Sequence, residues 1–153
     1  MNYIDSIFTG IIANIVFTIF LIYGIQKLRF WYFIRRNFHN KKFNTYWKRY
    51  PNDVVHTVIC KVKGNVICFK GSNQKKPDIF EGQFIINPIN LKMGEGYHSH
   101  NGTDGFAFLK VIVKDKNTLL VDAPYTGVKE NEKKQKYGVQ VFQAFIWKKI
   151  LNN

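Results

Sequence analysis

The feature that most constrains this chain is an uncharged apolar run near its N-terminus. No charged residue occurs between Ser6 and Gln26, and an α-helix of that length spans about 30 Å, the hydrocarbon thickness of a bilayer. The run therefore predicts a transmembrane helix. The alternatives are a buried core helix, which would show a polar face, and a cleaved signal peptide, which would begin with basic residues. The only charge before the run is Asp5, so we expect the helix to be retained.

The residues that follow the run predict its orientation. They include the cations Lys27, Arg29, Arg35, Arg36, Lys41 and Lys42. The positive-inside rule places the C-terminal body in the cytoplasm and the N-terminus outside. Phe30 to Phe33 are typical of an interfacial aromatic belt among headgroup-binding cations. We thus predict two parts: a membrane helix with a basic aromatic neck over residues 1–40, and a cytoplasmic domain over residues 41–153.

A polar stripe runs along the predicted span. Ser6, Gly10, Asn14 and Thr18 each follow the last by four residues, so on a helix they form one slowly winding line. Small residues let helix backbones approach, and Asn or Thr side chains bonded across a helix pair contribute about 0.6–2 kcal/mol each in lipid. The stripe predicts self-association of the helix. The alternative is a monomeric anchor that tolerates one asparagine.

The charge balance of the chain points to an anionic partner. The 153 residues carry a formal net charge of +13, which suits nucleotide phosphates, nucleic acid or an acidic membrane face, or serves solubility alone. Cys60 and Cys68 have no CxxC spacing, so no redox role follows from them.

Period-two alternation dominates the chain after residue 40 and predicts strands. The candidate strands are FNTYWKRY, VVHTVICKV, GNVICFKG, IFEGQFIIN, LKMGEGYHS, GFAFLKVIVK, NTLLVDAPY and GVQVFQAFIWKKI. About eight short antiparallel strands favour a small closed, lipocalin-like barrel, because closure removes exposed edges. A β-sandwich is the alternative. Gly71–Asp78 and Gly127–Tyr137 are predicted to be solvated loops.

Two turn candidates fix part of the register. A two-residue turn at Gly64-Asn65 places Val62 opposite Ile67 and Cys60 opposite Phe69. Cys60 and Cys68 then face opposite sides of the sheet, which excludes a disulfide. The same register predicts an inner face and an outer face, with Val58, Cys60, Val62, Ile67 and Phe69 inside and Lys61, Lys63 and Lys70 outside. Lys116-Asn117 is the second candidate turn.

Catalytic patterns are scarce in the predicted barrel. His98, His100 and Asp104 partly resemble the first metal motif of cupins, but no histidine follows His100 to complete a ligand set. No nucleophile–base pairing, Walker loop or GxGxxG motif occurs. We therefore predict no enzyme, no cofactor and no metal. Trp47 and Trp147 bracket the domain and are expected to plug the ends of the barrel, or to lie under nearby cations.

A small barrel can hold one ligand at its mouth, where aromatic faces stack bases and cations neutralise phosphates. The candidate ligand-binding residues lie at predicted strand ends: Arg49, Tyr97, His98, Lys110, Tyr125 and Thr126. The sequence does not decide whether Lys110, which alternates with Phe108 and Ile112, faces the core or the surface.

The layout resembles a known family, the membrane effectors of bacterial CBASS anti-phage defence that carry a cyclic-nucleotide-sensing β-barrel. The resemblance covers the whole chain as architecture, and locally it depends on FNTYW, GEGYHSHNGTDGFAF and FIWKKI. Effectors of this family have two N-terminal membrane segments, whereas one span is visible here.

The resemblance implies a bacterial inner-membrane protein whose barrel binds a cyclic dinucleotide from a partner nucleotidyltransferase. It also implies a homo-oligomer that contacts membrane lipid, binds no DNA or RNA polymer, and disrupts the membrane to kill or arrest the host. Within such systems the nucleotide either promotes assembly or restrains it. The alternative functions are a membrane-tethered, lipocalin-like module for an apolar ligand and a metal-dependent enzyme built on His98, His100 and Asp104.

Overall fold

The structure is a computed structural model that describes residues 3–73, 79–100, 107–130 and 136–151, including the side chains of most of them. By internal contact the chain divides into two units, Met1–Phe33 and Ile34–Asn153. The expected division after residue 40 stays a prediction. The first unit consists of the N-terminal helix, and the second contains the end of that helix and every strand.

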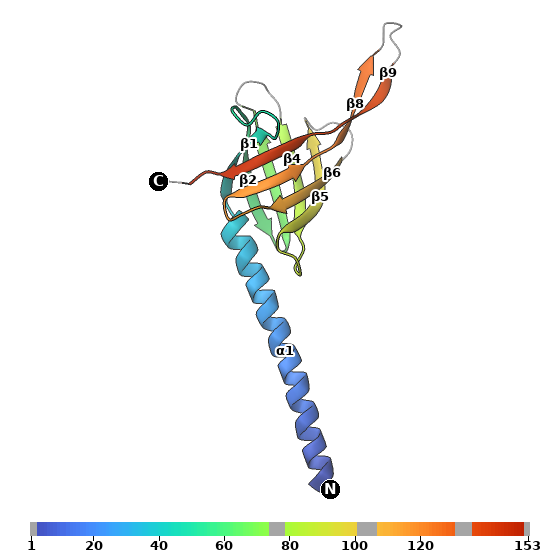
Figure 1. Cartoon of the computed structure of the whole chain (residues 1–153). Helices are drawn as coiled ribbons and strands as arrows, with labels where there is room; N and C mark the ends of the chain where they lie inside the picture. The colour runs from blue at the N-terminus through green and yellow to red at the C-terminus, as the bar shows by residue number, and fades with distance from the viewer. Residues whose placement is uncertain (1–2, 74–78, 101–106, 131–135, 152–153) are drawn as a thin grey trace. The chain divides into compact units, whose positions relative to one another are not determined.

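The helix α1 covers Tyr3–Phe38 and includes both the apolar run and the basic aromatic neck (Figure 1). It is long and apolar enough over Ile7–Phe38 to cross a membrane, and none of its most apolar window is buried. Apolar side chains such as Phe17 and Phe20 are exposed. The helix ends before Asn40, whose φ of 54° is left-handed, a conformation that asparagine tolerates and that commonly terminates a helix.

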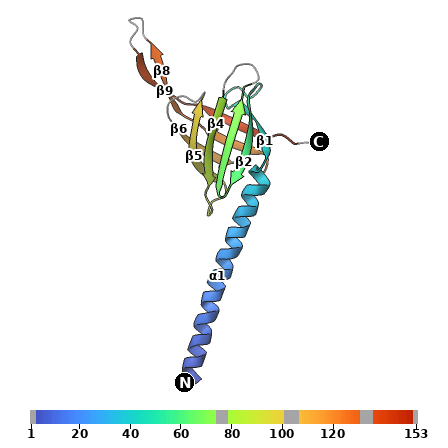
Figure 2. The same ribbon diagram turned by 180° about the vertical axis from the view of Figure 1, so that it is seen from behind.

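The second unit is a closed antiparallel barrel, so the barrel prediction is confirmed and the sandwich alternative is wrong (Figures 1 and 2). Around the barrel the strand order is β1-β10-β7-β6-β5-β4-β3-β2. The strand bounds are β1 Lys41–Trp47, β2 Val54–Lys63, β3 Val66–Ser72, β4 Ile79–Ile86, β5 Met93–His100, β6 Ala107–Val113, β7 Thr118–Asp122 and β10 Ala144–Lys149. Closure leaves this sheet with no free edge strand.

The predicted register of the β2–β3 hairpin is confirmed. Val62 lies opposite Ile67 and Cys60 opposite Phe69, and Gly64 takes a φ of 60° in the turn. The five residues predicted to face inward are buried, while Lys61, Lys63 and Lys70 are exposed. Both cysteines are free, Cys60 buried and Cys68 half-buried. Alternation therefore predicted the correct inner face wherever a tight turn fixed the pairing.

Aromatic side chains fill the described interior of the barrel. Trp147 is fully buried, and its ring lies 5.1 Å from that of Phe69, on a strand that is not its neighbour. At the end of the barrel where α1 leads into β1, Phe38 is buried and its ring centroid lies 5.6 Å from that of Phe84. Of the two tryptophans, at least one of which was expected to plug an end of the barrel, Trp147 belongs to the core, and Trp47, half-buried, stacks on Phe145.

The sequence prediction fails between β7 and β10. Gly127–Tyr137 was expected to be a loop, but the structure has β8 (Tyr125–Glu130) paired with β9 (Lys136–Val141) in a separate two-stranded sheet. The segment predicted as one strand, GVQVFQAFIWKKI, is divided between β9 and β10. Its first half alternates like a barrel strand, and the alternation did not show that this half, as β9, pairs with β8 outside the barrel. Gly71 and Ser72 also belong to β3 rather than to a loop.

The connection between β6 and β7 is longer than the predicted two-residue turn. It comprises residues 114–117, and the backbone N–H of Asn117 donates to the carboxylate of Asp115. This bond closes the loop as an Asx turn, a device in which an aspartate side chain replaces a backbone acceptor.

Candidate functional site

Of the six predicted ligand-binding residues, the four whose side chains are described do not converge on one site. His98 faces the interior and is 1% exposed, whereas its neighbour Tyr97 faces outward and is 54% exposed. Because successive residues of a strand point to opposite faces of the sheet, these two side chains cannot contribute to the same site. Arg49 is exposed in the β1–β2 connection. The backbone of Tyr125 and Thr126 belongs to β8, and their side chains lie outside the described set.

Lys110 faces the surface, because Leu109 and Val111 on either side of it are buried. In the strand register it lies opposite Glu95 on β5 and opposite Asp122 on β7. Two carboxylates on neighbouring strands offset its positive charge. The structure therefore offers no reason to single out Lys110 as a phosphate-binding group.

His98 has a structural role in the barrel wall. Its Nε2 lies 3.0 Å from the carbonyl oxygen of Pro124, and because a carbonyl can only accept, Nε2 carries the proton in this contact. His98 also packs against Phe80 at 5.5 Å between ring centroids, and Phe80 lies equally far from His56. The side chain of His100 and all of Asp104 lie outside the described residues, and the described ones contain no group of three or more potential metal ligands.

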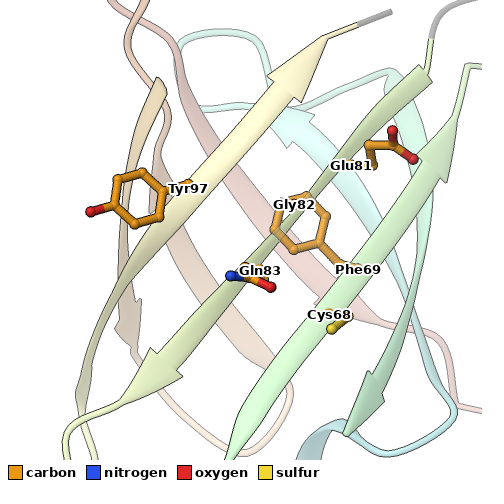
Figure 3. A pocket seen from close by; sticks show the side chains of 6 residues that line it. All are labelled: Cys68, Phe69, Glu81, Gly82, Gln83 and Tyr97. Carbon is orange, nitrogen blue, oxygen red and sulfur yellow. The ribbon is translucent and has the colours of Figure 1, made fainter. Parts of the chain in front are cut away.

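The structure instead forms an open pocket of about 590 Å³ on the outer wall of β3, β4 and β5 (Figure 3). This volume lies within the range of small-molecule sites. Of the predicted site residues, Tyr97 is the one that lines it. The other lining residues come from the two adjacent strands: Cys68, Phe69, Glu81, Gly82 and Gln83.

Glycines explain why these strands pass so close together. A Cβ at Gly82 would clash with the carbonyl oxygen of Tyr97 and lie 2.8 Å from Cζ of Phe69. A Cβ at Gly96 would clash with the carbonyl oxygen of Gln83. Because both positions lack a side chain, β4 and β5 approach closely and the Phe69 ring lies directly beneath Gly82. The glycines thus shape the wall of the pocket.

The polar groups of the pocket are varied and accessible. The carboxylate of Glu81 forms an ion pair with Nζ of Lys70 at 3.1 Å, with the Lys70 side chain 69% and the Glu81 side chain 38% exposed. Such a partly exposed pair contributes at most about 1 kcal/mol. Gln83 supplies an amide that donates and accepts, and Tyr97 supplies a phenol and a flat ring. This arrangement suits a planar heterocycle stacked on Tyr97, with its polar edge toward Gln83 and Glu81.

Sequence analysis missed Cys68, Glu81, Gln83 and Gly82 as pocket residues. A signal was present, because a glycine inside a strand pattern such as IFEGQFIIN marks close approach of another backbone. The pattern did not show which outward side chains gather around that glycine, since this depends on three strands at once.

The fold and the pocket define a class of protein: a small closed β-barrel joined to a helix capable of spanning a membrane, with a ligand-sized pocket on its outer wall. No protein-family model, curated protein or solved structure matches this chain.

Proposed function

We propose that this chain is a membrane effector of bacterial anti-phage defence, in which the barrel senses a cyclic dinucleotide and controls association of the membrane helix. In this proposal the protein is in the inner membrane, with its N-terminus outside and its barrel in the cytoplasm. Clustered helices then disrupt the membrane and kill the cell or arrest its growth.

The observation that carries the proposal is the architecture. One uninterrupted helix, Tyr3–Phe38, contains a segment capable of spanning a membrane and is followed, after the turn at residues 39–40, by a closed eight-stranded barrel. This layout is similar to that of the effector family that the sequence resembles, although effectors of that family have two N-terminal membrane segments and one is present here. The net charge of +13 supports an anionic ligand.

The outer-wall pocket is the proposed nucleotide site. Tyr97 offers a ring on which a base can stack, and Gln83 and Glu81 offer groups for the hydrogen-bonding edge of a base. Lys70 does not line the pocket, and its ammonium is paired with Glu81. The packed interior favours this outer site over the barrel mouth, since Trp147, Phe80 and Phe145 are fully buried there. The same packing gives no support to a carrier of apolar ligands, which needs an open interior.

Titration of the full-length protein in detergent with a panel of cyclic dinucleotides tests the sensing role. We expect one of them to bind and Tyr97→Ala to weaken its binding by about tenfold to a hundredfold, because stacking of a base on an aromatic ring contributes about 1–3 kcal/mol. Phe108→Ala is the matched control: Phe108 lies opposite Tyr97 in the register and is similarly exposed, but it does not line the pocket.

The two failures are distinguishable. If no cyclic dinucleotide binds, the barrel is not a sensor of this kind. If one binds and Tyr97→Ala behaves like Phe108→Ala, the site is elsewhere on the barrel. Cell viability with and without the partner nucleotidyltransferase then shows whether the nucleotide triggers or restrains toxicity.

A further inference from the structure

One end of the barrel, here named the basal rim, collects positive charge from segments far apart in the sequence. The basal rim consists of the last turn of α1, the start of β1, the β2–β3, β4–β5 and β6–β7 connections, and the end of β10. Because the barrel strands run up and down, all these segments meet at the end where α1 leads into β1 (Figures 1 and 2).

The hairpin connections of the basal rim bear exposed lysines: Lys63, Lys92, Lys114 and Lys116. Among the described residues of these connections and their flanking strand ends, Asp115 is the only acidic one. Its carboxylate accepts the Asn117 N–H within its own loop, an interaction that lowers its pKa. The rim is therefore strongly and almost uniformly basic.

The start of β1 and the end of β10 add further cations at the same end. Lys41 lies two residues before the core residue Phe43, and Lys149 lies two residues after the core residue Trp147. Because alternate residues of a strand share a face, both lysines are on the inward-facing side of their strands. Burial lowers the pKa of Lys149, and the charges of Lys41 and Arg36 lower it further. These three cations thus repel one another, and an anion placed among them would relieve that repulsion.

The β4–β5 connection of the basal rim also presents an apolar tip. Ile89 is 95% exposed, and its loop is ordered by the side chain of Asn87, whose Oδ1 accepts the N–H groups of Ile89 and Asn90. An exposed isoleucine side chain surrounded by lysines is typical of protein surfaces that insert into the headgroup region of a membrane.

The opposite end of the barrel, the distal end, lacks this charge pattern. Among its described barrel residues, Lys48 and Arg49 share the β1–β2 connection with Asp53. Exposed apolar residues occur there too, such as Tyr50. Only the basal rim therefore combines an apolar tip with unbalanced positive charge in the part of the barrel that the structure describes.

The helix sets the distance along the chain between the apolar run and the rim. Arg35 follows Gln26 by roughly nine residues, about 14 Å along the helix axis. A headgroup layer is about 5–8 Å thick, and the surface potential extends about another 8–10 Å at physiological ionic strength. The last turn of α1 therefore lies within range of charged lipid headgroups when the apolar run spans the bilayer.

We propose that the basal rim is a second membrane contact, in which the lysines of the rim bind the phosphates of anionic phospholipids and Ile89 inserts among the headgroups. The occupant is the membrane that α1 enters, because charge complementarity and chain continuity both lead to it. The proposal does not depend on nucleotide sensing. In this proposal the barrel is docked on the membrane, and its release from the lipid surface can change how the membrane helices associate.

The test uses the full-length protein with an environment-sensitive fluorophore on Ile89→Cys, in a Cys68→Ser background in which buried Cys60 stays unlabelled. The protein is placed in nanodiscs of phosphatidylcholine with or without phosphatidylglycerol, and quenching by doxyl-labelled lipid is measured. We expect strong quenching with phosphatidylglycerol and several times less at Asn52→Cys, an exposed control position at the distal end.

Charge variants separate lipid binding from simple proximity. Reversing Lys63, Lys92 and Lys116 to glutamate should lower the ratio of docked to undocked barrel at least a hundredfold, since each cation near an anionic surface contributes about fivefold. The control, Lys48→Glu with Arg49→Glu, should leave the ratio unchanged. Failure of Cys60 to react with a thiol reagent verifies that each variant is folded.

Three outcomes would overturn the proposal. The first is equal quenching at positions 89 and 52, and the second is equal quenching in neutral and anionic nanodiscs. The third is loss of quenching in inorganic phosphate but not in sodium chloride of equal ionic strength, which would indicate a pocket for one soluble anion instead of a lipid-binding surface.

Discussion

At the scale of single residues, the two cysteines lie on opposite faces of the barrel wall and differ in how accessible their thiols are. Cys60 faces the core, where burial, and then the neighbouring Cys68, raise its pKa far above the ordinary range. A thiol must ionise to react as a nucleophile, so Cys60 is inert in the folded protein. Cys68 is half-buried on the outer wall, where it lines the pocket beside Gln83.

We predict that a maleimide modifies one thiol of the folded protein, Cys68, and both thiols after denaturation. If the pocket is the nucleotide site, a bound cyclic dinucleotide should slow the reaction at Cys68 several-fold, because it covers the sulfur. Peptide mass spectrometry over a time course measures this. Rapid labelling of Cys60 under native conditions would contradict the core placement.

Tyr97 and His98 show what a single sequence leaves open at this scale. Both were predicted to lie at the end of a strand, whereas the structure has both inside β5 (Met93–His100), before its last residues. Alternation placed them on opposite faces but did not say which face was inside. His98 is buried because it lies opposite Ala107 and Gly82, where small residues leave room for an imidazole in the interior.

At the scale of elements, α1 carries no charged residue from Ile7 to Ile25, so the polar stripe is the main feature of this segment that could specify a partner. Gly10 and Asn14 are exposed, whereas the Thr18 hydroxyl donates to the Asn14 carbonyl of its own helix at 2.7 Å. Because this hydrogen bond uses the Thr18 hydroxyl proton within its own helix, Thr18 is a weaker hydrogen-bond donor to a second helix. The side chain of Ser6 lies outside the described set.

We predict that Asn14→Leu weakens helix association in bilayers by about 0.6–2 kcal/mol, because an asparagine in hydrocarbon gains most from a hydrogen bond across a helix pair. Thr18→Val should have a smaller effect. Single-molecule energy transfer between labelled copies in vesicles measures the association, with Ile15→Leu as the control. Asn14→Leu should also lower toxicity without changing nucleotide binding. Unchanged helix association in this variant would show that the polar stripe does not drive self-association.

At the scale of the whole molecule, the end of α1 belongs to the core of the barrel unit. Ile34 is fully buried and Phe38 is 1% exposed, close to Phe43 and Phe84. Removing a buried Ile or Phe side chain typically costs about 2–5 kcal/mol, and a whole domain is stable by only about 5–15 kcal/mol. The barrel therefore depends on residues that the sequence alone assigned to the neck.

We predict that a fragment of residues 34–153 folds cooperatively, whereas one of residues 41–153 is strongly destabilised or fails to fold. Urea denaturation followed by tryptophan fluorescence compares the two fragments. A 34–153 fragment carrying Phe38→Ala should fall between them. Equal stability of all three fragments would show that the helix end contributes nothing to the barrel.

The sequence by itself determined the elements that follow from local periodicity. The uncharged run specified a long helix, alternation specified the barrel strands, and Gly64-Asn65 fixed one register, because each of these signals depends on residues close together in the chain. The tertiary structure alone decided what lies across the barrel and around its ends. The pocket beside Gly82 depends on the outward side chains of three strands at once, and the basal rim brings together segments that are distant in sequence; both are set by closure of the barrel. The β8–β9 pair lies in a separate sheet, which no period in the sequence distinguished from the barrel strands.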